Sequence, residues 1–237
     1  MNPIFIHIPK NAGMTIRHRQ SKSRQYITPV TPDLLPDSTI KEFRQAMTKN
    51  GFTHPSHYNT EHARWRDLKP ELKEKKSFAV IRNPWDRVVS RYFFAKKVIE
   101  VEKKHDKSLA DVSSFEAFLE ERHKYGNIKY LWNRAVNGWF PATEHVCDDE
   151  GNVRCDMLRF EKLNDDLCAY LNITDMSRAR NVTNLNKGSY KDLYNPKTIQ
   201  IIADWYKNDI ETFGFDFDTG AKKNLWKINN NNERLKI

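Results

Sequence analysis

The chain has 237 residues, with 40 lysines and arginines against 31 aspartates and glutamates, and a formal net charge of +9. This length suits one domain with a single core, and the positive charge favours an anionic partner, such as a nucleotide, an acidic glycan, a nucleic acid or an anionic membrane. No apolar run is long enough to span a membrane, no signal peptide is visible, and three cysteines are too few for a disulfide framework.

The three cysteines, Cys147, Cys155 and Cys168, have no zinc-type spacing. A bridge between Cys147 and Cys155 across a hairpin is one interpretation, and free thiols in a reducing compartment are the one we favour. We expect a single domain over residues 1–220 and a disordered tail over residues 221–237, where four asparagines stand in a row.

An apolar run over residues 4–8 predicts a buried strand of an α/β sheet, which Pro9 ends because proline has no amide hydrogen to donate. A short loop with Lys10 and Gly13 follows, and Thr15 begins a helix. Loop amides and a helix N-terminus favour negative charge, so this stretch predicts an anion site. It is not the loop of nucleoside-triphosphate-binding proteins, because the lysine precedes the only glycine. A surface turn with a chance lysine is the alternative.

Two histidines stand in the next irregular stretch, after a short second strand over residues 26–30 and a helix over residues 38–49. His54 and His57 flank a proline, and either suits a general base, a metal ligand or a plain surface position. No cysteine, aspartate or glutamate stands at ligand spacing, so the sequence predicts no metal here.

A second apolar run over residues 77–81 predicts another buried parallel strand, with Arg82 at its carboxyl end. Asn83 is a good N-cap for the helix that follows, and Ser90 lies two turns along it. Ligands of α/β sheets bind outside the carboxyl ends of the strands, so Lys10 and Arg82 are expected at one edge. The alternatives are an Arg82 ion pair within the helix end and a Ser90 that is only a small packing residue.

The rest of the chain alternates between helical and extended patterns. We predict a helix that starts near Ser113, a helix over residues 128–136, a hairpin over 145–155, a strand over 157–160, a helix over 161–171 and a long helix over 196–213 that Gly214 ends. Between the last two helices, Lys187 and Gly188 lie in a polar loop suited to an anion.

Two stretches, residues 5–13 and 78–92, together resemble the two nucleotide-binding motifs of sulfotransferases. They look most like the carbohydrate family that includes chondroitin 4-O- and heparan 2-O-sulfotransferases and its bacterial members, and weaker matches continue to residue 215. The resemblance implies an α/β fold with a P-loop NTPase-like central parallel sheet flanked by helices. It also implies the sulfate donor 3′-phosphoadenosine 5′-phosphosulfate, without a metal.

The same resemblance implies roles for individual residues. The 5′-phosphosulfate would be held by the loop, Lys10, Asn11, Ala12, Gly13, Met14 and Thr15, with Lys10 also acting in catalysis. Arg82 and Ser90 would hold the 3′-phosphate, and Lys187 and Gly188 would help to bind the nucleotide. His57 is the preferred base that takes the acceptor proton, with His54 second.

Three positions depart from the family pattern. Asn11 stands where threonine is usual, and Met14 replaces a threonine or serine, so Thr15 must supply that hydroxyl. No glutamine follows Pro141, which leaves the acceptor open. We expect a carbohydrate acceptor and no nucleic acid; the oligomeric state is not predicted.

Two rival functions are a P-loop-type kinase and a non-catalytic basic module that binds glycans or nucleic acid. The kinase would need a Gly-Lys-Ser/Thr loop and a magnesium carboxylate. The module would show a steep salt dependence and no transfer. The protein is expected in the cytoplasm if the chain is complete, and in the Golgi lumen if it is a truncated domain.

Overall fold

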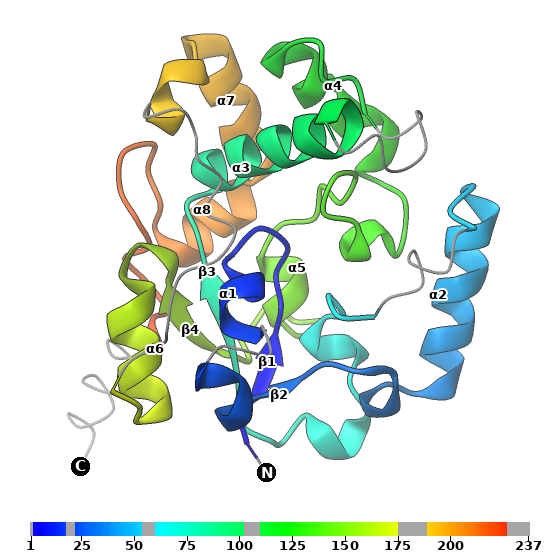
Figure 1. Cartoon of the computed structure of the whole chain (residues 1–237), viewed down its shortest axis with the longest axis vertical. Coiled ribbons are helices and arrows are strands. Elements are labelled where there is room, and N and C mark those ends of the chain that lie inside the picture. Colours follow the sequence, from blue (N-terminus) through cyan, green and yellow to red (C-terminus); the bar gives the residue numbers. More distant parts are fainter. Residues whose placement is uncertain (1, 18–21, 54–59, 102–109, 175–188, 227–237) are drawn as a thin grey trace.

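Four parallel strands form the central sheet of the computed structural model, which describes residues 2–17, 22–53, 60–101, 110–174 and 189–226 (Figure 1). The order across the sheet is β2–β1–β3–β4, with bounds Thr28–Pro29, Ile4–Ile6, Ser77–Ile81 and Asp156–Arg159. Because every pairing is parallel, all the carboxyl ends lie at one edge. The predicted α/β fold with a parallel sheet flanked by helices is confirmed.

Eight α-helices lie in the described part of the chain. They are α1 (Gly13–Arg17), α2 (Asp37–Lys49), α3 (Pro84–Lys96), α4 (Phe115–Tyr125), α5 (Thr143–Val146), α6 (Leu163–Leu171), α7 (Pro196–Trp205) and α8 (Lys207–Phe213). A π-helical turn, Lys97–Val101, extends α3. Within the described residues, no helix is both long and apolar enough to cross a membrane.

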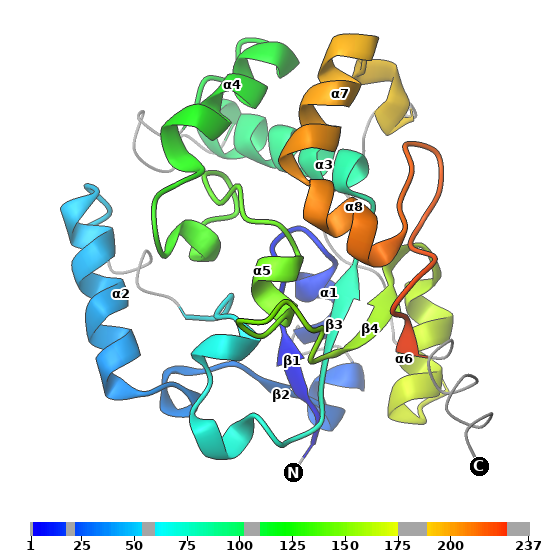
Figure 2. The same ribbon diagram turned by 180° about the vertical axis from the view of Figure 1, so that it is seen from behind.

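Alternate side chains of β1, β3 and β4 enter two separate cores, one on each face of the sheet. On one face, Phe5, Phe78 and Leu158 pack with α1 and α6, which lie in front of the sheet in Figure 1. On the other face, Ile6 and Ile81 belong to the larger core, which includes residues of α2, α3, α4, α5, α7 and α8 (Figure 2). Both faces are covered, which explains why the strands read as continuous apolar runs.

Two predicted helices differ in the structure. The segment 128–136 contains only a 3-10 turn, Leu131–Asn133, because Tyr130 adopts a left-handed φ of 71° that an α-helix does not allow. The segment 196–213 is two helices rather than one. They meet at Tyr206 (φ −106°, ψ 26°), whose buried hydroxyl accepts a hydrogen bond from Arg91 at 3.3 Å. At Tyr130 the backbone conformation interrupts the helical pattern, and at Tyr206 a tertiary contact accompanies the break.

The predicted hairpin over residues 145–155 reduces to a single antiparallel bridge between Cys147 and Val153, because His145 belongs to α5. Cys147, Cys155 and Cys168 are free thiols, as the preferred interpretation predicted. Burial raises the pKa of Cys147 to about 11 and that of Cys155 to about 12, so both stay protonated thiols at neutral pH.

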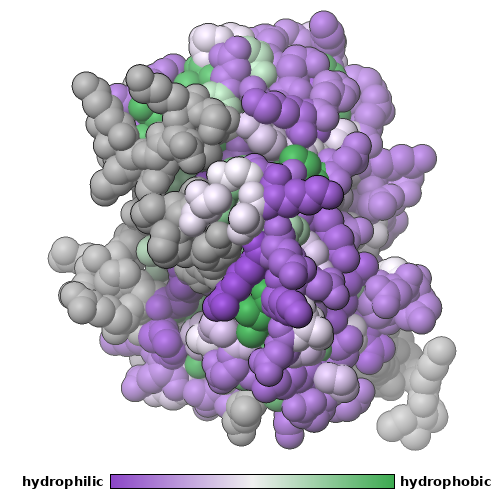
Figure 3. Space-filling view, turned by 90° about the vertical axis from the view of Figure 1, so that its right-hand side faces the viewer, coloured by the Kyte–Doolittle hydropathy of each residue, from purple (hydrophilic) through white to green (hydrophobic). Residues whose placement is uncertain are grey.

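The surface is predominantly hydrophilic on the face shown in Figure 3, where hydrophobic residues appear only as small separate spots. Among the described residues, Met14 and Tyr26 are the large hydrophobic side chains that are most exposed, at 41% each. Past residue 220, Ala221 and Leu225 are still buried in the larger core. The rest of the predicted tail, residues 227–237, lies outside the described residues.

Candidate active site

The loop between β1 and α1 has an unusual backbone. Lys10 and Ala12 both adopt left-handed φ values, 68° and 62°, which are uncommon for residues with a Cβ atom. The amides of Ala12, Gly13 and Met14 make no hydrogen bond to any other residue in the described parts of the chain. Alternating left-handed residues with unpaired amides form a concave nest that suits an anion, and we call residues 9–14 the anion loop.

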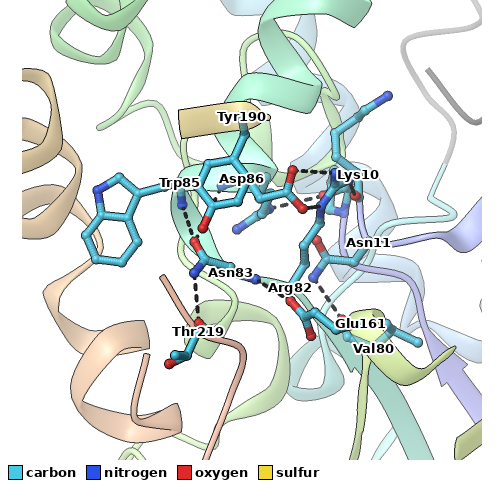
Figure 4. Close-up of polar contacts among 12 residues, drawn as sticks. Lys10, Asn11, Val80, Arg82, Asn83, Trp85, Asp86, Glu161, Tyr190 and Thr219 are labelled. Carbon is cyan, nitrogen blue, oxygen red and sulfur yellow. Dashed lines mark hydrogen bonds and ion pairs between the residues drawn. The ribbon is translucent and has the colours of Figure 1, made fainter. Parts of the chain in front are cut away.

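Two arginines from the second motif hold the anion loop from its carbonyl side. The Arg87 Nε donates to the Pro9 carbonyl at 3.1 Å, and the Arg82 Nη1 donates to the Lys10 carbonyl at 3.0 Å (Figure 4). Asn11 adds a third contact, because its side-chain amide donates to the Val80 carbonyl on β3 at 2.8 Å. The two sequence motifs are therefore one structural unit, and the predicted meeting of residues 10 and 82 at one edge is observed.

Arg82 forms the ion pair that was the alternative interpretation. Its Nε and Nη2 donate to the two oxygens of Asp86 at 2.6 and 2.8 Å, and the Phe160 ring lies 4.1 Å from its guanidinium carbon. Each Nη carries two N–H groups, and the named contacts use one on each. Within the described parts of the chain, one N–H on Nη1 and one on Nη2 thus remain for a ligand, so the ion pair and anion binding are compatible.

Lys10 is the ionisable residue of the anion loop, and its pKa is strongly shifted. Its Nζ lies 4.1 Å from the centre of the Phe94 ring. Burial lowers the pKa of Lys10 from 10.5 to about 7, and the positive charges of Arg82, Arg91 and Lys97 add to the effect. An anion placed among these groups would reverse the shift, because it would favour the protonated amine.

The remaining loop side chains divide between packing and exposure. Asn11 is buried, so the residue that replaces the usual threonine ties the loop to β3 instead of facing solvent. Met14 is exposed, whereas Thr15 is buried. Ser90 is buried within α3.

The lower part of Figure 4 shows how the start of α3 is anchored. The Asn83 side chain accepts from the amides of Trp85 and Asp86, which confirms the predicted N-cap. Its amide group also donates to the carbonyls of Asp216 and Thr219, both at 2.9 Å. These bonds join the second motif to the segment after α8, so the site depends on chain far downstream.

Residue 13 must be glycine because the His7 ring packs directly against its Cα, and not because of its φ angle. A Cβ built on Gly13 would lie 1.7 Å from Nε2 of His7, so the imidazole ring occupies the space that a side chain would need. His7 is buried, and burial lowers its pKa well below the ordinary value, with His62 and Arg17 adding to the effect. His7 was not among the residues predicted from the sequence to have a role. Its position directly before Ile8 and Pro9, at the end of the predicted strand, was the available signal.

Four candidate residues fall in other parts of the chain. The two candidate bases, His54 and His57, and the loop residues Lys187 and Gly188 lie outside the described residues. The chain that follows the histidines is described, and it returns to the anion loop. There, Glu61 forms an ion pair with Arg17 of α1, and the His62 Nδ1 lies 2.8 Å from the His7 carbonyl oxygen.

Comparison with known families agrees with this geometry. The family model described as "Sulfotransferase family" matches residues 3–216, which include both motifs and most of the chain. Comparisons with curated proteins and with solved structures found no match. The chain belongs to the sulfotransferase family, and its α/β fold with a parallel central sheet is consistent with that class.

We expect Gly13→Ala to destabilise the protein by about 1–3 kcal/mol, the usual cost of overpacking, because the new methyl group collides with His7. Urea denaturation of Gly13→Ala in the wild-type and His7→Ala backgrounds measures the collision. The cost should largely disappear when the ring is absent. Gly151→Ala serves as a comparison, since that glycine has a φ of +85° and open space around a built Cβ; its cost comes from backbone strain and should be the same in both backgrounds. An equal cost in both backgrounds would contradict the proposed clash.

Proposed function

We propose that the protein transfers a sulfuryl group from 3′-phosphoadenosine 5′-phosphosulfate to a hydroxyl group of a carbohydrate. The observation that carries this proposal is the anion loop, in which three amides have no partner among the described residues and Arg82 donates to the Lys10 carbonyl. Membership of the sulfotransferase family supports the reaction type. The identities of the sulfate donor and of the acceptor are proposed in addition to the reaction type.

Sulfuryl transfer, by analogy with phosphoryl transfer, is an in-line displacement in which negative charge moves to the leaving phosphate oxygen. Lys10 and the amides of Ala12, Gly13 and Met14 would stabilise that oxygen, because fixed donors act most strongly where charge develops. A sulfuryl group carries less charge than a phosphoryl group, so cationic side chains suffice and the transfer step needs no metal.

Arg82 and Ser90 are proposed to bind the 3′-phosphate. The two remaining N–H groups of Arg82 support this role, and Asp86 and Phe160 keep its guanidinium in place. Ser90 is buried in α3, so its hydroxyl can bind the 3′-phosphate only when that phosphate lies directly against this helix. Lys187 and Gly188 are proposed to help to bind the nucleotide.

His57 is proposed as the base that removes the acceptor proton, with His54 as the second candidate. The contacts that Glu61 makes with Arg17 and His62 with His7 support this proposal. They hold the chain a few residues after His57 beside the anion loop.

A carbohydrate acceptor is supported by the net charge of +9, which attracts both a nucleotide and an acidic glycan. The test is a two-stage measurement on the purified chain. In a thermal-shift assay, 3′-phosphoadenosine 5′-phosphate should raise the melting temperature and ATP with magnesium should not. A rise with ATP and magnesium alone would favour the kinase. Transfer of radiolabelled sulfate to a panel of glycans and small alcohols then identifies the acceptor. Salt-dependent glycan binding without any transfer would favour the non-catalytic module.

Lys10 generates a prediction about pH. In the empty site its pKa is about 7, and a bound anion raises it, so nucleotide binding takes up a proton above pH 7. The affinity for 3′-phosphoadenosine 5′-phosphate should therefore fall by up to about tenfold per unit between pH 7 and 9. Calorimetry in buffers of different ionisation enthalpy counts the protons.

Lys10→Arg is the matched control, because arginine stays protonated and should remove the proton uptake. Lys10→Ala should lower turnover far more than it weakens binding of the product nucleotide. Equal losses in turnover and binding would make Lys10 a binding residue only.

The candidate bases give a second prediction. His57→Ala should lower turnover by about 10²–10⁴-fold while nucleotide affinity is retained, because a general base contributes to the transition state and not to donor binding. His54→Ala is the matched variant from the same segment. If His54→Ala shows the large loss and His57→Ala does not, the roles are reversed.

A further inference from the structure

Three side chains with metal-ligating atoms meet behind the anion loop. One ligand atom from each of His7, Glu61 and His62 lies within 4.8 Å of the others. His7 follows β1, whereas Glu61 and His62 belong to the chain that returns beside it. We infer that these residues bind a divalent transition-metal ion of the Zn²⁺ type, separate from the sulfuryl-transfer step. The sequence analysis expected no metal.

The orientation of His62 supports this inference. Its Nδ1 lies 2.8 Å from the His7 carbonyl oxygen, and a carbonyl can only accept, so Nδ1 carries a proton. In the neutral ring, Nε2 then has a lone pair, and it lies 3.3 Å from Oε1 of Glu61. Two acceptors that face each other need a cation between them, either a proton or a metal ion. Histidine ligands commonly donate their second N–H to a backbone carbonyl in this way.

The spacing also fits a metal. Two atoms bound to a tetrahedral Zn²⁺ at about 2.0–2.1 Å lie about 3.3–3.4 Å from each other. The separation of 3.3 Å between the His62 Nε2 and the Glu61 Oε1 has this value. The ligand atoms of all three residues lie within 4.8 Å of one another, so His7 is near enough to be the third ligand.

His7 provides an independent observation. It is buried, 5% exposed, and its Nδ1 makes no hydrogen bond within the described residues. A buried ring nitrogen without a partner is uncommon in proteins and marks a place for a ligand.

Charged groups around the three ligands both favour and oppose the binding of a cation. Arg17 pairs with Oε2 of Glu61, so it orients the carboxylate with Oε1 toward His62. The positive charges of Arg17 and Lys10 act on His7 and weaken cation binding, and Glu61 offsets them. The Glu61 side chain is 21% exposed, which gives an ion access from solvent.

A metal at this position would join two segments that are far apart in sequence. The bond would tie the chain after residue 60 to the end of β1, directly behind Gly13 of the anion loop. Three protein ligands leave a fourth position for water or an anion. The expected effect is stabilisation of the loop, because a ligand that binds only the folded state raises the melting temperature.

The test uses the full chain, stripped of metal and without nucleotide, so its outcome is independent of sulfate transfer. Zn²⁺ is titrated by calorimetry, and Co²⁺ is titrated by visible absorption. We expect one ion per chain, cobalt bands of a tetrahedral site without a thiolate charge-transfer band, and a higher melting temperature with Zn²⁺.

His62→Asn is the decisive variant, because the asparagine amide can still donate to the His7 carbonyl while the Nε2 ligand is lost. It should weaken Zn²⁺ binding at least about tenfold. His123→Asn is the matched control, since His123 is an exposed histidine whose Nε2 lies 3.5 Å from a Glu120 oxygen, and its affinity should equal that of the wild type. Glu61→Gln serves as the second ligand variant if His62→Asn does not fold.

Several outcomes would overturn the inference. These are no binding to the wild type, wild-type affinity in the ligand variant that folds, and a thiolate band from the cysteines. Loss of binding in His57→Ala with normal binding in His62→Asn would move the metal to another site. Absence of Zn²⁺ binding would leave a proton as the cation between His62 and Glu61, and the sulfotransferase proposal would be unaffected.

Discussion

The contact on which the rest of the structure depends is the grip of two arginines on the carbonyls of the anion loop. Arg87 binds the Pro9 carbonyl and Arg82 binds the Lys10 carbonyl. With these two carbonyls held, the backbone can keep left-handed φ values at Lys10 and Ala12 that residues with a Cβ atom rarely adopt. The amides that follow are left for an anion. The anion loop and the start of α3 therefore form one structural unit, although they come from two distant parts of the chain.

This arrangement concentrates positive charge where water is largely excluded. The cost is visible in the lowered pKa values of Lys10, about 7, and Arg91, about 10, both caused mainly by burial. Asp86 offsets the charge of Arg82, and the aromatic rings of Phe94 and Phe160 lie against the two cations. An anion bound at the anion loop would relieve the same repulsion, because negative charge favours the protonated forms of these groups.

The parallel sheet makes this possible because it aligns the ends of strands that are distant in sequence. Ile4 pairs with Ser77 and Ile6 with Ala79, so β3 runs on past the end of β1 and carries Arg82 to the anion loop. The return of residues 60–62 to the same place puts Glu61 and His62 next to His7. The candidate active site and the inferred metal site therefore share one wall, the chain from His7 to Gly13.

Local patterns in the sequence were enough to predict the α/β class, strand β3 at its observed bounds, the N-cap at Asn83 and the position of a loop with Lys10 between a strand and a helix, because these features depend mainly on neighbouring residues. Only the tertiary structure decided why Gly13 must be glycine, how Arg82 divides its donors, and where the helix breaks at Tyr206. The physical reason is the same in each case. The deciding contacts join residues that are close in space and not adjacent in the chain, such as Arg82 with Lys10 and Tyr206 with Arg91.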